Sequence, residues 1–198
     1  LPLHFGMGTE TQHRTMAQRL WALIEENGSH LNTGFTATPY ILFALADNGF
    51  AGEAYELLLQ DGDPSWLYPI HQGATTIWEQ WGSIQPDSSI RESSLNHYAY
   101  GAVGDFFYRR VCGLEPVEAG YRRFRVKPVT GGDLQFAECE HKSPFGWIRV
   151  RWERREETFR LRITVPVSTV CQVVMPNGEE KTIGSGSYEF EQVVTAYA

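Results

Sequence analysis

The sequence predicts a multi-domain α+β protein. A helical layer of an α/α barrel or toroid is expected over residues 1–113, and an antiparallel β-sandwich over residues 114–198. Apolar residues recur at helical spacing up to about Gly113 and alternate with polar residues after it. Aromatic side chains also gather in the loops between the expected helices, as they do at one end of a helical toroid. A length of 198 residues suits one large domain or two small ones.

The first two helices have clear start and stop signals. Thr9 is followed three residues later by Gln12, which is the spacing of a capping box, and the helix is expected to end at Asn27-Gly28. A second helix is expected at Thr38-Pro39, with the threonine as N-cap and the proline in the first helical position.

Three further helices are expected before the change in periodicity. One covers about residues 52–60, a short one begins at Thr75 or Thr76, and the last covers about residues 96–112. Five helices of this length do not close a barrel. We therefore expect their inner faces to be covered by another chain, by self-association or by residues that precede this sequence.

The second half of the chain reads as short strands separated by turns. Polar and apolar residues alternate in four segments, and Pro144-Phe145-Gly146 and Pro176-Asn177-Gly178 mark turns between strands. This pattern is typical of an antiparallel sandwich in which each sheet has one buried face. The expected strands are residues 123–129, 147–152, 158–165 and 188–195.

The composition excludes several classes of function. The formal net charge of -7 argues against nucleic acid or an anionic membrane as a partner. No apolar run approaches the roughly 20 residues that span a bilayer. The three cysteines are scattered and the six histidines form no His-x-x-x-His pair. We therefore expect neither a metal site nor a cofactor.

The segment Trp78-Glu79-Gln80-Trp81 is the first candidate site, because it places a carboxylate between two indoles. Aromatic rings match the apolar faces of sugars and lower the dielectric around a neighbouring acid, so this arrangement suits the acid/base chemistry of glycosidases. The alternative is a helix start, in which the carboxylate complements the helix dipole. Trp78 precedes the glutamate and is expected to pack in the core.

Arginines recur along the expected strands, at Arg149, Arg151, Arg160 and Arg162. The simplest interpretation is the solvated face of a sheet, and the alternative is a patch that binds anions or carbohydrate.

Several strings of the sequence, taken in order, resemble glycoside hydrolase family 78, the α-L-rhamnosidases. The resemblance extends from about His30 to the turn at residues 176–178. The strings that carry it are HLNTGF (30–35), TPY (38–40), YELLL (55–59), PSWLYP (64–69), GATTIWEQW (73–81), NHYAYGAVG (96–104) and SPFG (143–146).

This resemblance implies an (α/α)6 catalytic barrel followed by a β-sandwich, and an inverting hydrolysis of rhamnose-containing glycosides without a cofactor. Inverting enzymes use two carboxylic acids, one to protonate the leaving oxygen and one to activate water. The general base of the family maps to Glu79, and its sugar-contacting histidine maps to His97. Trp66 and Trp81 are expected to form walls of the sugar site.

The sequence departs from the family pattern in two respects. Residues 82–95 form a shorter stretch between motifs than is usual, which affects the expected choice of aglycone. The general acid of the family belongs to a motif that we do not find here, so we expect a C-terminal fragment that is inactive alone. The alternative hypothesis is a non-catalytic carbohydrate-binding or structural module that retains the fold.

Overall fold

A computed structural model describes residues 1–193 of the chain. It divides into two compact units, Leu1–Gly104 and Asp105–Ala198, each of which is described separately below. The first unit is helical and the second consists mainly of strands, as the change in periodicity predicts.

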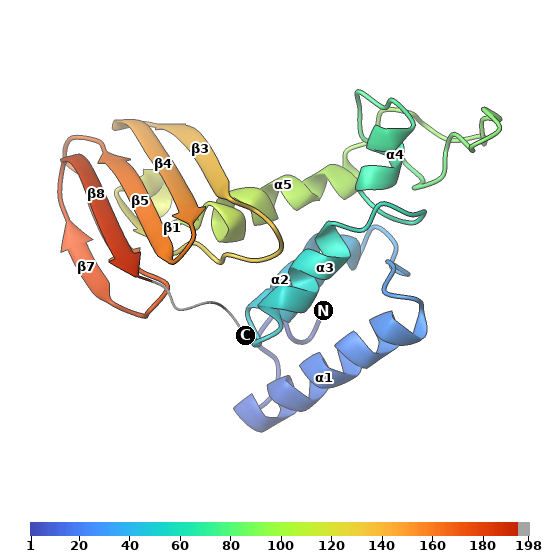
Figure 1. The fold of residues 1–198 in the computed structure, drawn as a ribbon, viewed down its shortest axis with the longest axis horizontal. Helices are drawn as coiled ribbons and strands as arrows, with labels where there is room; N and C mark the ends of the chain where they lie inside the picture. Colours follow the sequence, from blue (N-terminus) through green and yellow to red (C-terminus); the bar gives the residue numbers. More distant parts are fainter. Residues whose placement is uncertain (194–198) are drawn as a thin grey trace. The chain divides into compact units, whose positions relative to one another are not determined.

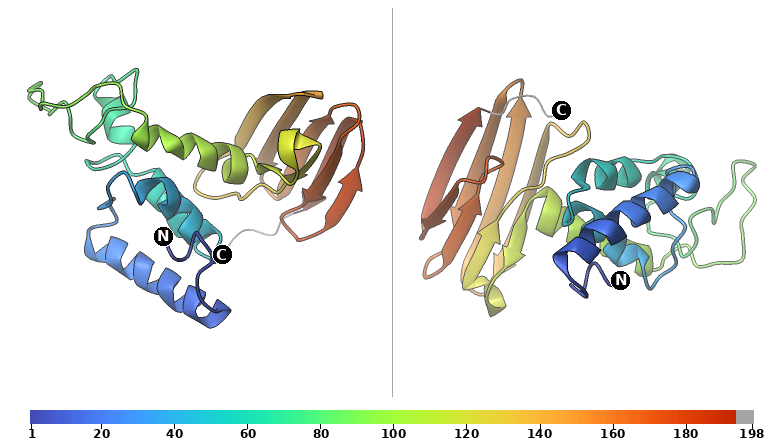
Figure 2. Two further views of the ribbon diagram at one scale, coloured as in Figure 1. Left: turned by 180° about the vertical axis from the view of Figure 1, so that it is seen from behind. Right: turned by 90° about the horizontal axis from the view of Figure 1, so that it is seen from below.

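The helical unit contains helices α1 to α4, of which α2 and α3 pack against each other (Figures 1 and 2). Leu3, Ala17 of α1 and Ala44 of α2 form a small buried cluster that joins these segments. Helix α2 is the most buried helix, since Ile41, Leu42, Phe43, Ala44 and Leu45 are all inaccessible. The helix bounds are α1 Glu10–Glu26, α2 Thr38–Ala46, α3 Ala51–Leu58 and α4 Leu67–His71.

The predicted helix starts agree with the structure to different degrees. The capping box of α1 is confirmed, because the Thr9 hydroxyl accepts the Gln12 N–H and the Gln12 side chain accepts the Thr9 N–H. The cap predicted for α2 is wrong by one residue. Thr38 lies inside the helix, Ala37 is the N-cap, and the Thr38 hydroxyl donates to the carbonyl of Gly34 at 3.0 Å. A threonine that satisfies the preceding loop in this way is not available to the helix amides.

The predicted helix at Thr75 or Thr76 is wrong, because residues 72–98 contain no helix. The short helix of this region is α4, which lies earlier, in a segment that the sequence suggested to be a loop. The predicted helix over residues 96–112 is found as a continuous helical run. It consists of a 3-10 turn (η1, Ala99–Ala102), an α-helical turn (α5, Val103–Phe106) and a π-helical turn (η2, Phe107–Val111).

The sheet unit contains two four-stranded sheets, ordered β1-β2-β6-β7 and β3-β4-β5-β8. Figure 1 shows β3, β4, β5 and β8 side by side. A short 3-10 turn, η3 (Ala119–Tyr121), lies between the first two strands. The strand bounds are β1 Leu114–Pro116, β2 Arg123–Val126, β3 Phe136–Ser143, β4 Gly146–Arg155, β5 Thr158–Val165, β6 Val170–Val174, β7 Glu180–Ile183 and β8 Gly186–Val193.

The second sheet is antiparallel throughout, but the first is mixed, because β2 and β6 run parallel. The expectation of a purely antiparallel sandwich is therefore corrected at this one pair. Each sheet buries one face, as the alternating pattern predicts: Phe124 and Val126 are buried on β2, and Val150 and Trp152 on β4. The predicted strand 188–195 is found up to Val193, and its last two residues lie outside the described part of the chain.

Within residues 1–193, no helix is long and apolar enough to cross a membrane.

Candidate functional site

Two segments that are far apart in sequence lie side by side around Glu79. The Glu79 N–H donates to the carbonyl of Ser94 at 2.9 Å, and the His97 N–H donates to the carbonyl of Ile77 at 2.7 Å. The Thr76 hydroxyl donates to the carbonyl of Leu95 at 2.5 Å. These bonds hold the Glu79 and His97 segments together, although neither is a regular strand.

The Glu79 carboxylate is fixed from one side. Its Oε2 accepts the backbone N–H of Ser94 at 2.8 Å, so Glu79 makes two hydrogen bonds to the same residue. The side chain is half-buried, and no residue of the described chain is bonded to its second oxygen, Oε1. A carboxylate held by one oxygen, with the other available, is suited to accept a proton from water.

His97 is held in one tautomer by the backbone of Ala99. Its Nδ1 accepts the N–H of Ala99 at 3.2 Å, so in the neutral imidazole the proton is on Nε2. The ring stacks on Phe35 at 5.0 Å between centroids, which fixes its plane. The free Nε2–H is a donor that a sugar hydroxyl oxygen can accept.

Aromatic rings connect the other predicted residues. Trp81 stacks on Tyr100 with centroids 3.7 Å apart and planes at 13°, and it meets Trp66 edge-on at 5.3 Å. Tyr100 also meets Phe35 edge-on at 5.3 Å, and Phe35 in turn stacks on His97. The structure thus brings Trp66, Trp81 and His97 into one aromatic cluster through two residues that the sequence analysis did not single out.

The tryptophans differ in what they offer to a ligand. Trp66 is buried and its indole N–H donates to the carbonyl of Tyr100 at 3.0 Å, whereas Trp81 is only partly buried. Trp78 is 3% exposed, which confirms that it packs in the core. Of the three indoles, Trp81 is the one with the most surface to present to a sugar ring.

Phe35 and Tyr100 were missed as site residues, although both lie in strings that resemble the family, 30–35 and 96–104. A signal was present, since each lies within three residues of a polar residue of the same string. Their role as connectors, however, depends on packing between distant loops, which no local pattern reports.

We found no group of three or more His, Cys, Asp or Glu side chains placed to hold a metal ion among residues 1–193. A cavity of the described chain lies in the sheet unit, lined by residues of η2, β3, β4, β5 and β8, and not beside Glu79.

The comparisons with protein families assign both halves of the chain. Residues 1–111 match the bacterial alpha-L-rhamnosidase 6 hairpin glycosidase domain. Residues 113–190 match the bacterial alpha-L-rhamnosidase C-terminal domain. The chain therefore belongs to the bacterial α-L-rhamnosidase family, which confirms the resemblance seen in the sequence.

Individual relatives agree with this assignment. The chain is 41% identical over 179 residues to an α-L-rhamnosidase of Streptomyces avermitilis, covering 89% of this chain and 17% of the relative. A Formosa agariphila α-L-rhamnosidase is 36% identical over 186 residues, which cover 92% of this chain and 20% of the relative. The native α-L-rhamnosidase structure of Aspergillus terreus superposes with a TM-score of 0.92 at 36% identity, covering 96% of this chain and 23% of that one.

The crystal structure of the Streptomyces avermitilis enzyme, complexed with L-rhamnose, gives a TM-score of 0.91 at 37% identity and covers 96% of this chain and 21% of that one. The chain thus spans about a fifth of the length of the relatives that it matches.

Proposed function

We propose that this chain is the C-terminal part of an inverting α-L-rhamnosidase that hydrolyses terminal α-L-rhamnosyl linkages. In this proposal residues 1–113 are part of an (α/α)6 barrel, and residues 114–198 are a C-terminal β-domain. The observation that carries the proposal is the pairing of the Glu79 and His97 segments, which holds a carboxylate and an N–H donor beside an aromatic cluster.

Each of these residues has a role in the proposed reaction. Oε1 of Glu79 takes a proton from water while that water attacks the anomeric carbon, and the Ser94 N–H keeps the carboxylate in place. The Nε2–H of His97 donates to a sugar hydroxyl, and Trp81, backed by Trp66, covers an apolar face of the ring. The general acid is supplied by residues outside the 198 of this chain, so the chain by itself does not turn over substrate.

The test uses a chimera in which this chain replaces the matched segment of the 41% identical Streptomyces avermitilis relative. We expect Glu79→Gln to lower kcat on an aryl α-L-rhamnoside by about 10²–10⁴-fold, which is the contribution of general base catalysis. Binding of L-rhamnose should persist, because the amide retains the shape of the side chain. Glu92→Gln is the matched control, since Glu92 is an exposed carboxylate in the adjoining loop.

Wild-type turnover in the Glu79→Gln chimera would overturn the assignment of the base. An NMR measurement of the first-formed anomer tests inversion independently, and retention of configuration would reject the proposed mechanism. Both tests require that the chimera with Glu79 intact hydrolyses the aryl α-L-rhamnoside. A chimera that folds and binds L-rhamnose but does not hydrolyse, even with Glu79 intact, would instead favour the non-catalytic carbohydrate-binding module.

A further inference from the structure

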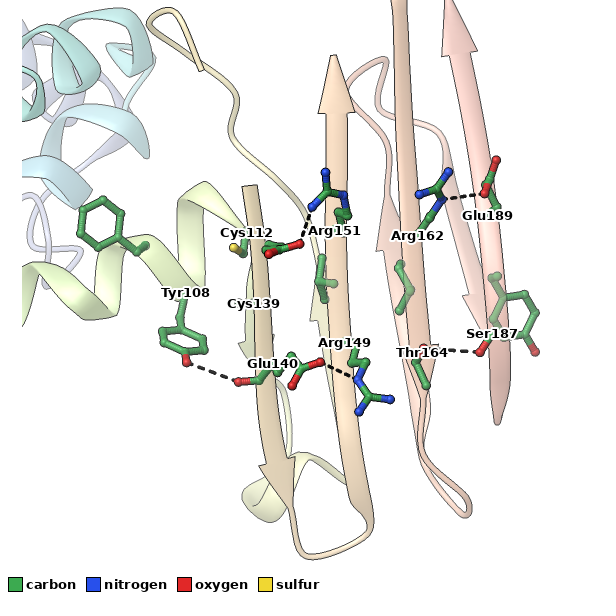
Figure 3. Close-up of a pocket in the computed structure, with 15 residues that line it drawn as sticks. Tyr108, Cys112, Cys139, Glu140, Arg149, Arg151, Arg162, Thr164, Ser187 and Glu189 are labelled. Atoms are coloured by element: carbon green, nitrogen blue, oxygen red, sulfur yellow. Dashed lines mark hydrogen bonds and ion pairs between the residues drawn. The ribbon is translucent and has the colours of Figure 1, made fainter. Parts of the chain in front are cut away.

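A cavity of about 870 Å³ lies in the sheet unit (Figure 3). It extends from η2 across all four strands of the second sheet. Four strands spaced about 4.8 Å apart give it a length of about 14 Å. The proposed reaction at Glu79 uses none of the residues that line it.

Two parallel rows of side chains form the walls of this cavity, which we call the trough. The strand register aligns Glu140, Arg149, Thr164 and Ser187 in one row. The next row, two residues away along each strand, consists of Glu138, Arg151, Arg162 and Glu189. Side chains of one face recur every second residue, so the rows lie about 7 Å apart. This spacing leaves a channel over the backbone between them.

The arginines of the trough are all paired with carboxylates. The Arg149 Nε donates to Glu140 at 2.6 Å, the Arg162 Nε donates to Glu189 at 2.8 Å, and Arg151 is bonded to Glu138 and Glu153. Their side chains remain 37–53% exposed, as the interpretation of a solvated sheet face predicts. An anionic ligand would have to displace these carboxylates, which argues against the anion-binding alternative.

A neutral ligand rich in hydroxyl groups suits the same walls without displacing anything. Each guanidinium has further N–H groups beyond the one bonded to its partner, and each carboxylate has lone pairs left. Neighbouring hydroxyls of a sugar match this forked arrangement, since one can accept from the arginine while the other donates to the glutamate. Each wall thus offers both hydrogen-bond donors and acceptors to a ligand.

Aromatic rings stand at the η2 end of the trough. Phe107 and Tyr108 of η2 are 43% and 42% exposed, and the Tyr108 hydroxyl donates to the carbonyl of Glu140 at 3.3 Å. Half-exposed aromatic rings beside fixed polar groups give a sugar ring an apolar surface to lie on.

We propose that the trough is a second binding site, which holds a short neutral oligosaccharide and has no part in hydrolysis. The choice of a rhamnose-containing ligand rests on the proposed function. The geometry of the walls is independent of the proposed function, because it follows from the register of β3, β4, β5 and β8.

The experiment titrates the 198-residue chain with a neutral rhamnose-capped trisaccharide by isothermal titration calorimetry. The test variant is Arg162→Ala with Glu189→Ala, which removes one wall pair and leaves the net charge unchanged. We expect it to weaken binding about tenfold or more, because it removes charge-assisted hydrogen bonds. The matched control is Lys181→Ala with Glu179→Ala, an exposed ion pair at 3.0 Å at β7 of the first sheet, which does not line the trough.

Binding that is equal in the two double variants, or absent in the wild type, would overturn the proposal. The same variants in the chimera separate it from the proposed function, because trough variants should hydrolyse a small aryl rhamnoside at the parental rate. If Phe107 and Tyr108, which are 43% and 42% exposed, are protected from hydroxyl-radical labelling in the chimera with no sugar present, relative to the 198-residue chain, the trough is covered by polypeptide and the proposal is wrong.

Discussion

Glu115 is the charged residue whose replacement we expect to cost most in stability. It follows Leu114 at the start of the first sheet, and its side chain is only 14% exposed. Arg109 and Arg125 each approach its carboxylate at 2.5 Å, and Arg110 lies at 3.5 Å. Burial alone would raise the pKa of Glu115, but the hydrogen bonds from Arg109 and Arg125 and the charge of Arg110 lower it to about 2.

This lowering of the pKa sets the size of the stability loss that we expect when Glu115 is replaced. The change from the usual 4.5 to about 2 corresponds to about 3 kcal/mol, at 1.36 kcal/mol per pKa unit. Water reaches Arg109 and Arg125, whose side chains are 31% and 39% exposed, so we expect about 2–3 kcal/mol. Glu115→Gln should lower the free energy of unfolding of the sheet unit by this amount near neutral pH.

The pH dependence distinguishes this cause from a simple loss of packing. The folded-state pKa of Glu115 is depressed, so its contribution is complete above the unfolded pKa of 4.5 and is lost as the pH falls toward about 2. The difference between wild type and Glu115→Gln should therefore be constant from neutral pH to about pH 5.5 and then shrink toward pH 2.

Urea titrations provide the measurement, followed by the amide NMR signals of β2 so that the sheet unit is observed by itself. Glu118→Gln is the control. The Glu118–Arg123 pair is 3.6 Å apart with side chains 50% and 56% exposed, and its loss should cost less than about 1 kcal/mol. Equal losses in the two variants, or a Glu115 effect that does not change with pH, would refute the reasoning.

Three further predictions concern the backbone, a helix cap and a thiol. Gly113 has φ +78°, and an added Cβ would lie 2.2 Å from the backbone of Lys127, so Gly113→Ala should lower the Tm of the sheet unit by more than about 10 °C. Gly178→Ala is its control, because Gly178 has φ +85° with open space around it and should cost about 1 kcal/mol. Thr9→Ala removes one bond of the capping box and should destabilise α1 by about 1 kcal/mol, measured as faster amide exchange in its first turn. Burial raises the pKa of Cys171 to about 12, so mass spectrometry after iodoacetamide treatment of the folded chain at pH 8 should find it unmodified, and modification before unfolding would contradict its burial.

The elements that sequence reasoning located well are those whose signals are local. The capping box at Thr9 is complete within four residues, and the alternation in residues 158–165 reports one buried face of one strand. The strands that were not predicted are β1, β3, β6 and β7. In β3 the inward positions are Ala137, Cys139 and His141, which are small or polar, so the alternation is weak. The fold class followed from periodicity, but half of the strands did not.

The pairing of strands could not be predicted, because it depends on contacts between distant residues. β2 pairs with β6 in parallel, with Phe124 opposite Cys171, across more than forty residues of sequence. A parallel pair needs a long crossover, and here that crossover contains β3, β4 and β5. No local turn signal distinguishes this connection from a series of hairpins.

The candidate site shows the same division between local and distant information. Glu79, His97, Trp66 and Trp81 were named from motifs, and the structure places three of them in one aromatic cluster and Glu79 on the segment paired with His97. The alternative interpretation of Glu79 was that of a first-turn carboxylate at a helix start. It fails for a structural reason, because the Thr76 hydroxyl bonds to Leu95 instead of capping a helix.

Without a helix dipole to complement, the position of Glu79 needs another explanation. Its carboxylate accepts a single backbone N–H and is half-buried, with one oxygen unbonded to the described chain. A purely structural carboxylate in such a place would gain more from an arginine partner, as Glu115 does with three. The contrast between these two glutamates is therefore the strongest physical argument for a chemical role: both oxygens of Glu115 are bonded to arginines, whereas Glu79 has an oxygen that no residue of the described chain bonds.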